Sequence, residues 1–203
     1  HKEFRVLRCV LVIALVAGIL ALAPVSVHAQ SATDFVPVTD AILKEPSPDD
    51  WLMWRRTFNG WGYSPLEQID RTNVGNLRMV WSRALNTPGR QQGTPLAYNG
   101  VLYMPNPNDH LQAINAVTGD LQWEYRREIP DDAPQVLGGA ALVSVNRNVA
   151  IYGGVIIDTG NDGYVYAVDA VTGELSWETE ISDYNVAPMR HTSGPMIANG
   201  KAI

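Results

Sequence analysis

The sequence predicts an all-β protein built from repeated four-stranded sheets, and three observations support this prediction. Residues 98–123 align without a gap with residues 152–177, at a constant offset of 54 residues. A fixed period of this size is typical of repeat architectures. Each unit also contains short β-compatible runs separated by turn signals. Finally, each unit closes on a tryptophan, Trp123 or Trp177, after an Ala-Val-Thr-Gly turn. Such units are typical of β-propeller blades, which stack around an axis because one sheet cannot bury both of its faces.

The strands of the two complete units are expected at regular intervals. They are 94–98, 101–104, 111–115 and 120–126 in the first unit, and 148–152, 155–158, 164–169 and 174–181 in the second. Asn99-Gly100 and Gly153-Gly154 are suited to two-residue hairpin turns, because Asn and Gly tolerate positive φ.

A third unit begins at residues 194–200, which match residues 94–100 at an offset of 100. A closed propeller commonly needs four to eight blades. We therefore expect about two complete blades and the start of a third, from the N-terminal part of a longer protein.

The N-terminus is predicted to be a targeting segment, residues 1–29. Three basic residues precede an apolar run at residues 10–22, and Val27-His28-Ala29 supplies a small-x-small cleavage site. This pattern is typical of a secretory signal peptide, cleaved before Gln30, and predicts a periplasmic product without a membrane span. The alternative is a transmembrane anchor, which the short apolar run and Pro24 disfavour because a bilayer core is ~30 Å thick.

The single cysteine and the net charge exclude several classes. Cys9 precedes the apolar run, whereas a lipoprotein cysteine would follow it, and the chain after residue 29 contains no cysteine for a disulfide or a thiolate metal site. Removing residues 1–29 takes three of the 15 basic and one of the 21 acidic residues, so the formal charge moves from −6 to −8. An acidic chain repels phosphate backbones, so nucleic acid is not an expected partner.

Residues 30–76 are predicted to be an irregular lead-in arm, and residues 77–203 to form the blades. The arm is Pro-rich at first, with at most a short helix near residues 39–44. Residues 51–66 are rich in aromatic side chains, which suggests that this part of the arm packs on the body of the protein formed by the blades. Residues 71–77 suggest a short helical turn capped by Thr72 or Asn73. Residues 77–85 are β-compatible, with Trp81 at their centre.

One motif occurs in both units, at residues 113–123 and 167–177: Ala-x-(Asn/Asp)-Ala-Val-Thr-Gly-(Asp/Glu)-Leu-x-Trp. It resembles the tryptophan-docking motif of the pyrroloquinoline-quinone (PQQ) dehydrogenases, the eight-bladed quinoprotein propellers. Residues 61–77 are similar to the N-terminal signature of the same family, so the resemblance covers about residues 50–203. It implies that each motif tryptophan lies between adjacent blades, where burial of its large apolar surface stabilises the stack by about 2–3 kcal/mol.

The resemblance also implies three cofactor-binding residues. Gln92 stands where relatives have a polar or acidic side chain before Gly-x-Pro-Leu. Arg147 is the Arg of the family's Val-Asn-Arg, and Thr192 lies in a segment whose Thr hydrogen-bonds the quinone. PQQ carries three carboxylates, and a planar guanidinium binds such groups through two donors. Each of these residues also has an alternative role without a cofactor: Arg147 as a solvated surface arginine, Gln92 as an ordinary loop amide, and Thr192 as the cap of a turn. Ala141-Leu142 replaces the adjacent cysteine pair of many relatives.

The function implied by the resemblance is periplasmic oxidation of an alcohol by PQQ. A carboxylate beyond residue 203 would take the hydroxyl proton, and hydride would pass to the quinone C5. A divalent metal such as Ca²⁺, with ligands outside this chain, would polarise the carbonyl. Electrons would leave to a periplasmic carrier such as a cytochrome c. The alternative is a non-enzymatic scaffold propeller of outer-membrane protein assembly. Such scaffolds are usually lipoproteins, and the absent lipoprotein signal and the Val-Asn-Arg segment favour the enzyme.

Two further groups of polar residues are not expected to form sites. His110 and His191 have no two-histidine metal spacing and are expected in exposed loops. Asp158, Asp162 and Asp169 suggest a calcium site, but Asp169 belongs to the repeated motif and Asp162-Gly163 to a hairpin turn. The sequence therefore names no metal ligand.

Overall fold

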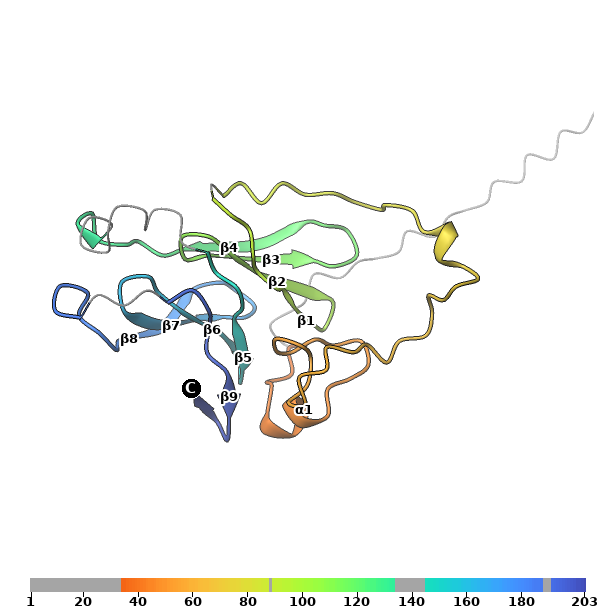
Figure 1. Cartoon of the computed structure of the whole chain (residues 1–203), viewed down its shortest axis with the longest axis horizontal. Coiled ribbons are helices and arrows are strands. Elements are labelled where there is room, and N and C mark those ends of the chain that lie inside the picture. Colours follow the sequence, from red (N-terminus) through yellow and green to blue (C-terminus); the bar gives the residue numbers. More distant parts are fainter. Residues whose placement is uncertain (1–33, 88, 134–144, 188–190) are drawn as a thin grey trace, which may run out of the picture.

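A computed structural model describes residues 34–87, 89–133, 145–187 and 191–203. The proposed signal peptide at residues 1–29 and the Ala141-Leu142 pair lie outside these residues. The described chain consists of two four-stranded antiparallel sheets, the first hairpin of a third unit, and an N-terminal arm (Figure 1). Among the described residues, no helix has the length and apolar character needed to cross a membrane.

Both sheets have the simple up-and-down strand order of a propeller blade. The first contains β1 (Leu96–Tyr98), β2 (Val101–Asn106), β3 (His110–Asn115) and β4 (Leu121–Arg126). The second contains β5 (Ala150–Tyr152), β6 (Val155–Thr159), β7 (Tyr164–Asp169) and β8 (Leu175–Glu180). The third unit begins with β9 (Ile197–Ala198) and β10 (Lys201–Ala202). All eight strands expected in the two units are present, with ends within two residues of their predicted positions.

The two sheets repeat each other in detail. Each has its register shift at the same place, between Ala113 and Ile114 in one and between Ala167 and Val168 in the other. The sides of the two sheets that face each other form the core. Tyr103 packs there against Trp123 at 6.0 Å between ring centroids, and Tyr125 packs against Tyr166 at 5.7 Å. The predicted fold, stacked antiparallel blades, is confirmed.

The docking role predicted for Trp123 is confirmed. Its side chain is 8% exposed, and its Nε1 donates to the carbonyl of Ala170 in the second sheet, at 3.1 Å. Asp169 shapes the receiving turn, because its Oδ1 accepts from two backbone N–H groups of that turn. Gly173 has φ +75°, and a Cβ there would lie 2.6 Å from the Trp123 ring. Glycine is therefore required both by the turn and by the indole.

Trp81 docks in the same way on the first sheet. Its Nε1 donates to Ala116 O at 3.1 Å, and a Cβ on Gly119 would lie 2.6 Å from its ring. Residues 77–85, which are β-compatible in sequence, pair with no strand among the described residues.

Trp177 was expected to be as buried as Trp123, but it is 39% exposed, on a strand whose residues are all exposed. The docking direction explains the difference. Each tryptophan packs on the turn of the unit that follows it, and the described part of the third unit contains only β9 and β10.

The N-terminal arm is fastened to the innermost strands. Helix α1 (Asp40–Lys44) is the predicted helix, and Thr39 caps it by accepting from Ile42 N–H. Val38 forms a bridge with Gly153, and Trp51 with Ala97. The short 3₁₀ turn η1 (Val74–Asn76) also lies where it was expected, with Asn73 at its N-terminal boundary.

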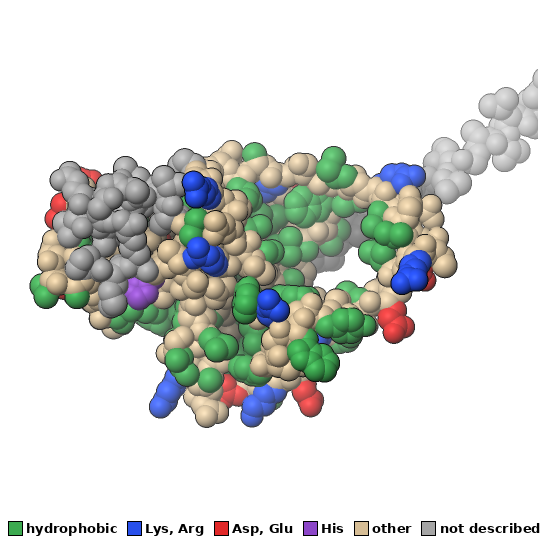
Figure 2. All heavy atoms as spheres, viewed as in Figure 1, with side chains coloured by type: hydrophobic (Ala, Val, Ile, Leu, Met, Phe, Trp, Pro, Cys, Tyr) green, Lys and Arg blue, Asp and Glu red, His purple; other side chains and the backbone are tan. Residues whose placement is uncertain are grey.

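One expectation about the arm is wrong, and another holds only in part. The Asn73 side chain makes no capping bond to η1; Asp70 accepts from the N–H groups of Thr72 and Asn73 instead. The aromatic segment, residues 51–66, was expected to pack on the body. Its first part does, because Trp51 pairs with Ala97 and Leu52 is buried in the core, but Trp61 and Tyr63 are exposed. The chain around η1 (yellow in Figure 1) swings away from the sheets and returns to them, and the space-filling view shows open space inside this excursion (Figure 2).

Candidate cofactor-binding site

The residues that lead into the innermost strands of the three units are joined to one another. Thr94 N–H, ahead of β1, donates to Arg147 O at 2.8 Å, and Arg147 N–H, ahead of β5, donates to Thr192 O at 3.1 Å. Gly194 N–H, ahead of β9, donates to Asn148 O at 2.8 Å. These backbone bonds bring equivalent ends of three consecutive units side by side.

Two of the three predicted cofactor residues are in direct contact. Arg147 is exposed, and its Nη1 donates to the carbonyl of Thr192, at 3.3 Å, and to the Thr192 hydroxyl. The pair combines a guanidinium with a hydroxyl whose own proton can be donated onward. Both groups suit a ligand rich in anionic oxygens.

Gln92 has a looser relation to the pair. It is exposed and stands two residues before Thr94, so its backbone reaches the same end of the sheets, but among the described residues its side chain does not bond to Arg147 or Thr192. The side chain of its neighbour Gln91 is instead held in place, because Gln91 Nε2 donates to Pro105 O at 2.9 Å.

Glycines allow the close approach of the chain at this end. A Cβ on Gly93 would lie 2.2 Å from Pro105 O, and a Cβ on Gly194 would lie 2.3 Å from Asn148 O. Real side chains do not tolerate such contacts, so the tight junction beside Arg147 and Thr192 depends on these two positions.

Buried polar residues behind the pair were missed by sequence reasoning. Asn146 Nδ2 donates to Asp158 Oδ2 at 2.5 Å, and Tyr166 OH donates to the same oxygen at 3.0 Å. Asp158 Oδ1 accepts from Thr159 N–H at 2.8 Å, and Thr159 Oγ1 donates to Ser193 O at 2.9 Å. The sequence did contain one indication of this network, the acidic Asp158 at the end of an apolar strand, but it suggested Asp158 only as a metal ligand.

Burial raises the pKa of Asp158 to about 7, and the nearby Asp109 acts in the same direction. Burial also raises the pKa of Asp109 to about 6, although Asn161 N–H donates to its carboxylate at 2.9 Å. An unfolded aspartate ionises near pH 4, so the folded chain holds these two protons over a pH range where the unfolded chain has lost them.

This difference predicts a pH-dependent loss of stability. Below about pH 4, Asp158 is protonated in both states; between about pH 4 and 7 the unfolded state binds fewer protons, so the free energy of unfolding falls as pH rises. The total is at most about 4 kcal/mol for three pKa units. Urea unfolding of Asp158→Asn across this range should show a flatter profile than wild type. Parallel profiles would contradict the raised pKa.

A buried arginine joins the two complete units nearby. Arg127 Nη1 donates to Asp162 Oδ2 at 2.6 Å and Nη2 to Glu178 Oε2 at 3.2 Å. Its guanidinium also lies 4.7 Å from the ring centroid of Tyr164. Asp162 is therefore neutralised by a cation. Among the described residues, no group of three or more histidine, cysteine, aspartate or glutamate side chains is placed to hold a metal ion.

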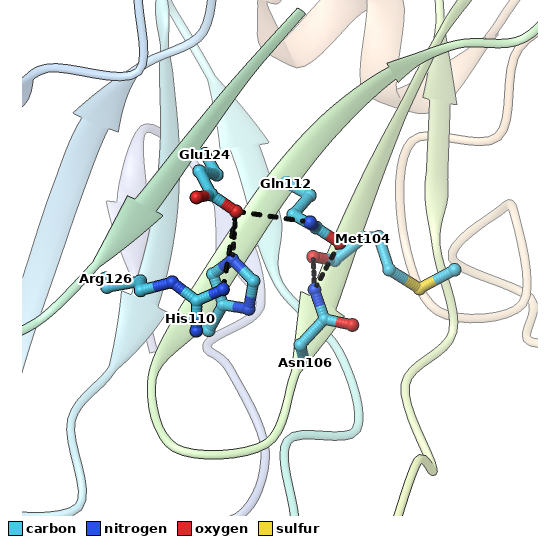
Figure 3. A network of polar contacts seen from close by, with 6 residues as sticks. All are labelled: Met104, Asn106, His110, Gln112, Glu124 and Arg126. Carbon is cyan, nitrogen blue, oxygen red and sulfur yellow. Dashed lines mark hydrogen bonds and ion pairs between the residues drawn. The ribbon is translucent and has the colours of Figure 1, made fainter. Parts of the chain in front are cut away.

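A second polar network lies on the first sheet and corrects one expectation (Figure 3). His110, predicted in an exposed loop, is 1% exposed, because it begins β3 and is paired with strands on both sides. Its Nε2 lies 3.2 Å from Oε2 of Glu124, which also accepts from Gln112 and Arg126. Burial lowers the pKa of His110, and the Arg126 guanidinium adds to the effect.

This network does not contact the predicted cofactor residues. Within the described chain its bonds join Met104, Asn106, His110, Gln112, Glu124 and Arg126 (Figure 3). We assign it a structural role in the first sheet. The candidate site is therefore the Arg147–Thr192 pair with Gln92 at the same end.

Comparison with known families decides the assignment of the chain. Residues 51–177, which include both docking turns and Arg147, match the family model described as glucose/ethanol/alcohol dehydrogenase, β-propeller domain, of the PQQ type. The chain belongs to this PQQ dehydrogenase family. The family proposed from the docking motif is thus confirmed.

Several PQQ dehydrogenases are similar to the chain over most of its length. The alcohol dehydrogenase (quinone), dehydrogenase subunit, of Gluconacetobacter polyoxogenes is 34% identical, covering 93% of this chain and 26% of that protein. The quinohemoprotein alcohol dehydrogenase ADH-IIG of Pseudomonas putida is 31% identical, covering 93% and 26%. The chain therefore spans about a quarter of the length of the curated relatives it matches.

Solved structures of the family share the fold. The structure of ADHIIG from Pseudomonas putida matches with a TM-score of 0.73 and 31% identity, over 83% of this chain and 25% of that one. A europium-containing methanol dehydrogenase matches with a TM-score of 0.68 and 27% identity, over 79% and 28%.

Proposed function

We propose that this chain is part of a periplasmic PQQ-dependent alcohol dehydrogenase, in which Arg147, Thr192 and Gln92 bind the quinone. The observation that carries the proposal is the contact between Arg147 and Thr192 at the joined ends of three units. Family membership supports PQQ as the ligand, and the names of the relatives support an alcohol as the substrate.

The residues present suit PQQ in charge and in geometry. The ligand carries three carboxylates, and Arg147 offers a permanent positive charge with a planar set of donors. The hydroxyl of Thr192 accepts from Arg147 and keeps a proton for a ligand oxygen. Gln92 adds a neutral donor and acceptor, so it binds without the charge that an acidic residue would bring.

Bound PQQ would supply the hydride acceptor for alcohol oxidation. Among the described residues, no group of three or more histidine, cysteine, aspartate or glutamate side chains is placed to hold a metal ion, and Asp158 is buried and bonded to Asn146. We place the proton-accepting carboxylate and the ligands of Ca²⁺, or of another metal ion, beyond residue 203. One relative is the 1-butanol dehydrogenase (cytochrome c) of Thauera butanivorans, which supports a cytochrome c as electron acceptor. We also propose export, with cleavage before Gln30.

Titration of the intact apoprotein, the full-length protein of which this chain is part, with PQQ and excess Ca²⁺ tests the proposal. We expect saturable changes in quinone absorbance, followed by oxidation of short alcohols with an artificial electron acceptor. A second titration with a lanthanide ion in place of Ca²⁺ tests whether PQQ binding needs a different metal. If the protein binds no PQQ with either metal, the non-enzymatic scaffold becomes the better assignment.

A further inference from the structure

We infer that Asp158 and Thr159, at the end of β6, are positioning residues for the Arg147–Thr192 pair; this inference rests on the cofactor role proposed for that pair. Neither residue is assigned to the ligand itself. Each holds the chain neighbour of one member of the pair: Asp158 holds Asn146, next to Arg147, and Thr159 holds Ser193, next to Thr192.

The first link runs from Asp158 to Arg147. Asp158 is completely buried and Asn146 nearly so, whereas Arg147 is exposed. The 2.5 Å bond between the Asn146 amide and the Asp158 carboxylate therefore anchors the chain on the buried side of Arg147. The exposed guanidinium is free to meet a ligand while its backbone stays fixed.

The second link runs from Thr159 to Thr192. The Thr159 hydroxyl donates to Ser193 O at 2.9 Å, across the junction between the second and third units. Thr192 is held from its other side by Arg147 N–H. One strand end thus sets the separation and relative orientation of both candidate ligand-binding residues.

The burial of Asp158 is costly, which indicates a role that an apolar residue would not fill. It follows Val155, Ile156 and Ile157 in β6, a run that another aliphatic residue would continue. Burying a carboxylate costs free energy unless its oxygens are bonded, and here both oxygens accept hydrogen bonds from the chain. Residues that break a local packing preference in this way are most often found supporting functional sites.

Small displacements matter for recognition by a planar guanidinium. A binding group displaced by about 1 Å loses much of its contribution, so residues that lock its position are part of the site's performance. We therefore expect variants at Asp158 and Thr159 to weaken cofactor binding more than their effect on unfolding would explain.

The test compares matched variants of the intact protein by PQQ titration and by thermal unfolding of the apoprotein. Thr159→Val removes the hydroxyl, and Thr159→Ser keeps it. We expect the Kd for PQQ to rise about 2- to 10-fold in Thr159→Val, the loss of one neutral hydrogen bond, and to stay near wild type in Thr159→Ser. In a Thr192→Ala background, Thr159→Val should have a smaller effect, because the residue that it positions is gone.

The second comparison uses two donors to the same carboxylate oxygen. Asp158→Ala removes the acceptor of the bond to Asn146, whereas Tyr166→Phe removes the other donor and leaves the bond to Asn146 in place. We expect the Kd for PQQ to rise in the Asp158 variant and to stay unchanged in Tyr166→Phe. Equal effects of the two variants, or wild-type binding by Thr159→Val, would overturn the inference and leave the proposed function intact. If wild type binds no PQQ, or Arg147→Ala binds it normally, the proposed function falls and the inference with it.

Discussion

Replacing Trp123 with alanine should destabilise the intact protein by about 3–5 kcal/mol, the usual cost of removing a large buried aromatic side chain. The indole fills the space between two sheets, contacts Gly173 and donates to Ala170 O. Alanine cannot fill this space, and the structure around such a cavity relaxes only partially. Urea unfolding followed by far-ultraviolet circular dichroism measures the loss.

Trp123→Phe is the graded control. It keeps an aromatic ring in the gap but loses the indole N–H and part of the buried area, so its cost should be smaller than that of alanine. A loss below about 1 kcal/mol for Trp123→Ala would show that the junction between the sheets does not depend on this side chain.

Replacing Arg147 with alanine should weaken PQQ binding by about 2–5 kcal/mol, because an anionic ligand group would be left desolvated without its partner. This corresponds to a rise in Kd from about 30-fold to several thousand-fold. The measurement is quinone absorbance titration of the intact apoprotein with metal in excess. Arg147 is exposed, so the variant should unfold at nearly the same temperature as wild type.

Arg147→Lys separates charge from geometry. An ammonium group retains the positive charge but cannot present two parallel donors, so it should recover only part of the affinity. Arg78, an exposed arginine of the arm, provides the matched control, and its alanine variant should bind PQQ as wild type does. Wild-type affinity in Arg147→Ala would remove Arg147 from the site.

The repeat made most of the fold predictable from the sequence. The turn chemistry is local: a glycine with positive φ follows Thr118 or Thr172, and an Asn or Asp side chain accepts the turn's N–H groups. These features follow from residue type, so strands and turns were placed within two residues. The family resemblance also selected Arg147, from Val-Asn-Arg, and Thr192, from the segment at residues 191–195, and the structure brings these two residues into contact.

Features that depend on partners distant in sequence were not predictable. The β-compatible run around Trp81 pairs with no strand among the described residues, because strand formation needs a neighbouring strand, which the run's own residues do not reveal. His110 is polar, yet its place in the sheet buries it. The support given to Arg147 and Thr192 by Asp158 and Thr159 crosses from β6 to segments 12 and 34 residues away. No sequence period indicates such contacts.

The direction of tryptophan docking has a consequence for the order in which the protein matures during synthesis. Trp81 and Trp123 each precede the turn that receives them, at Gly119 and Gly173. The Trp123 side chain leaves the ribosome roughly 50 residues before its receiving turn, which at about 5–20 residues per second is an interval of about 3–10 s. Throughout that interval an indole and one face of a finished sheet remain open to water. Where the chain folds in the order in which it emerges, each unit therefore reaches its full packing only when the following unit is available, and until then its exposed indole and sheet face make it prone to aggregation.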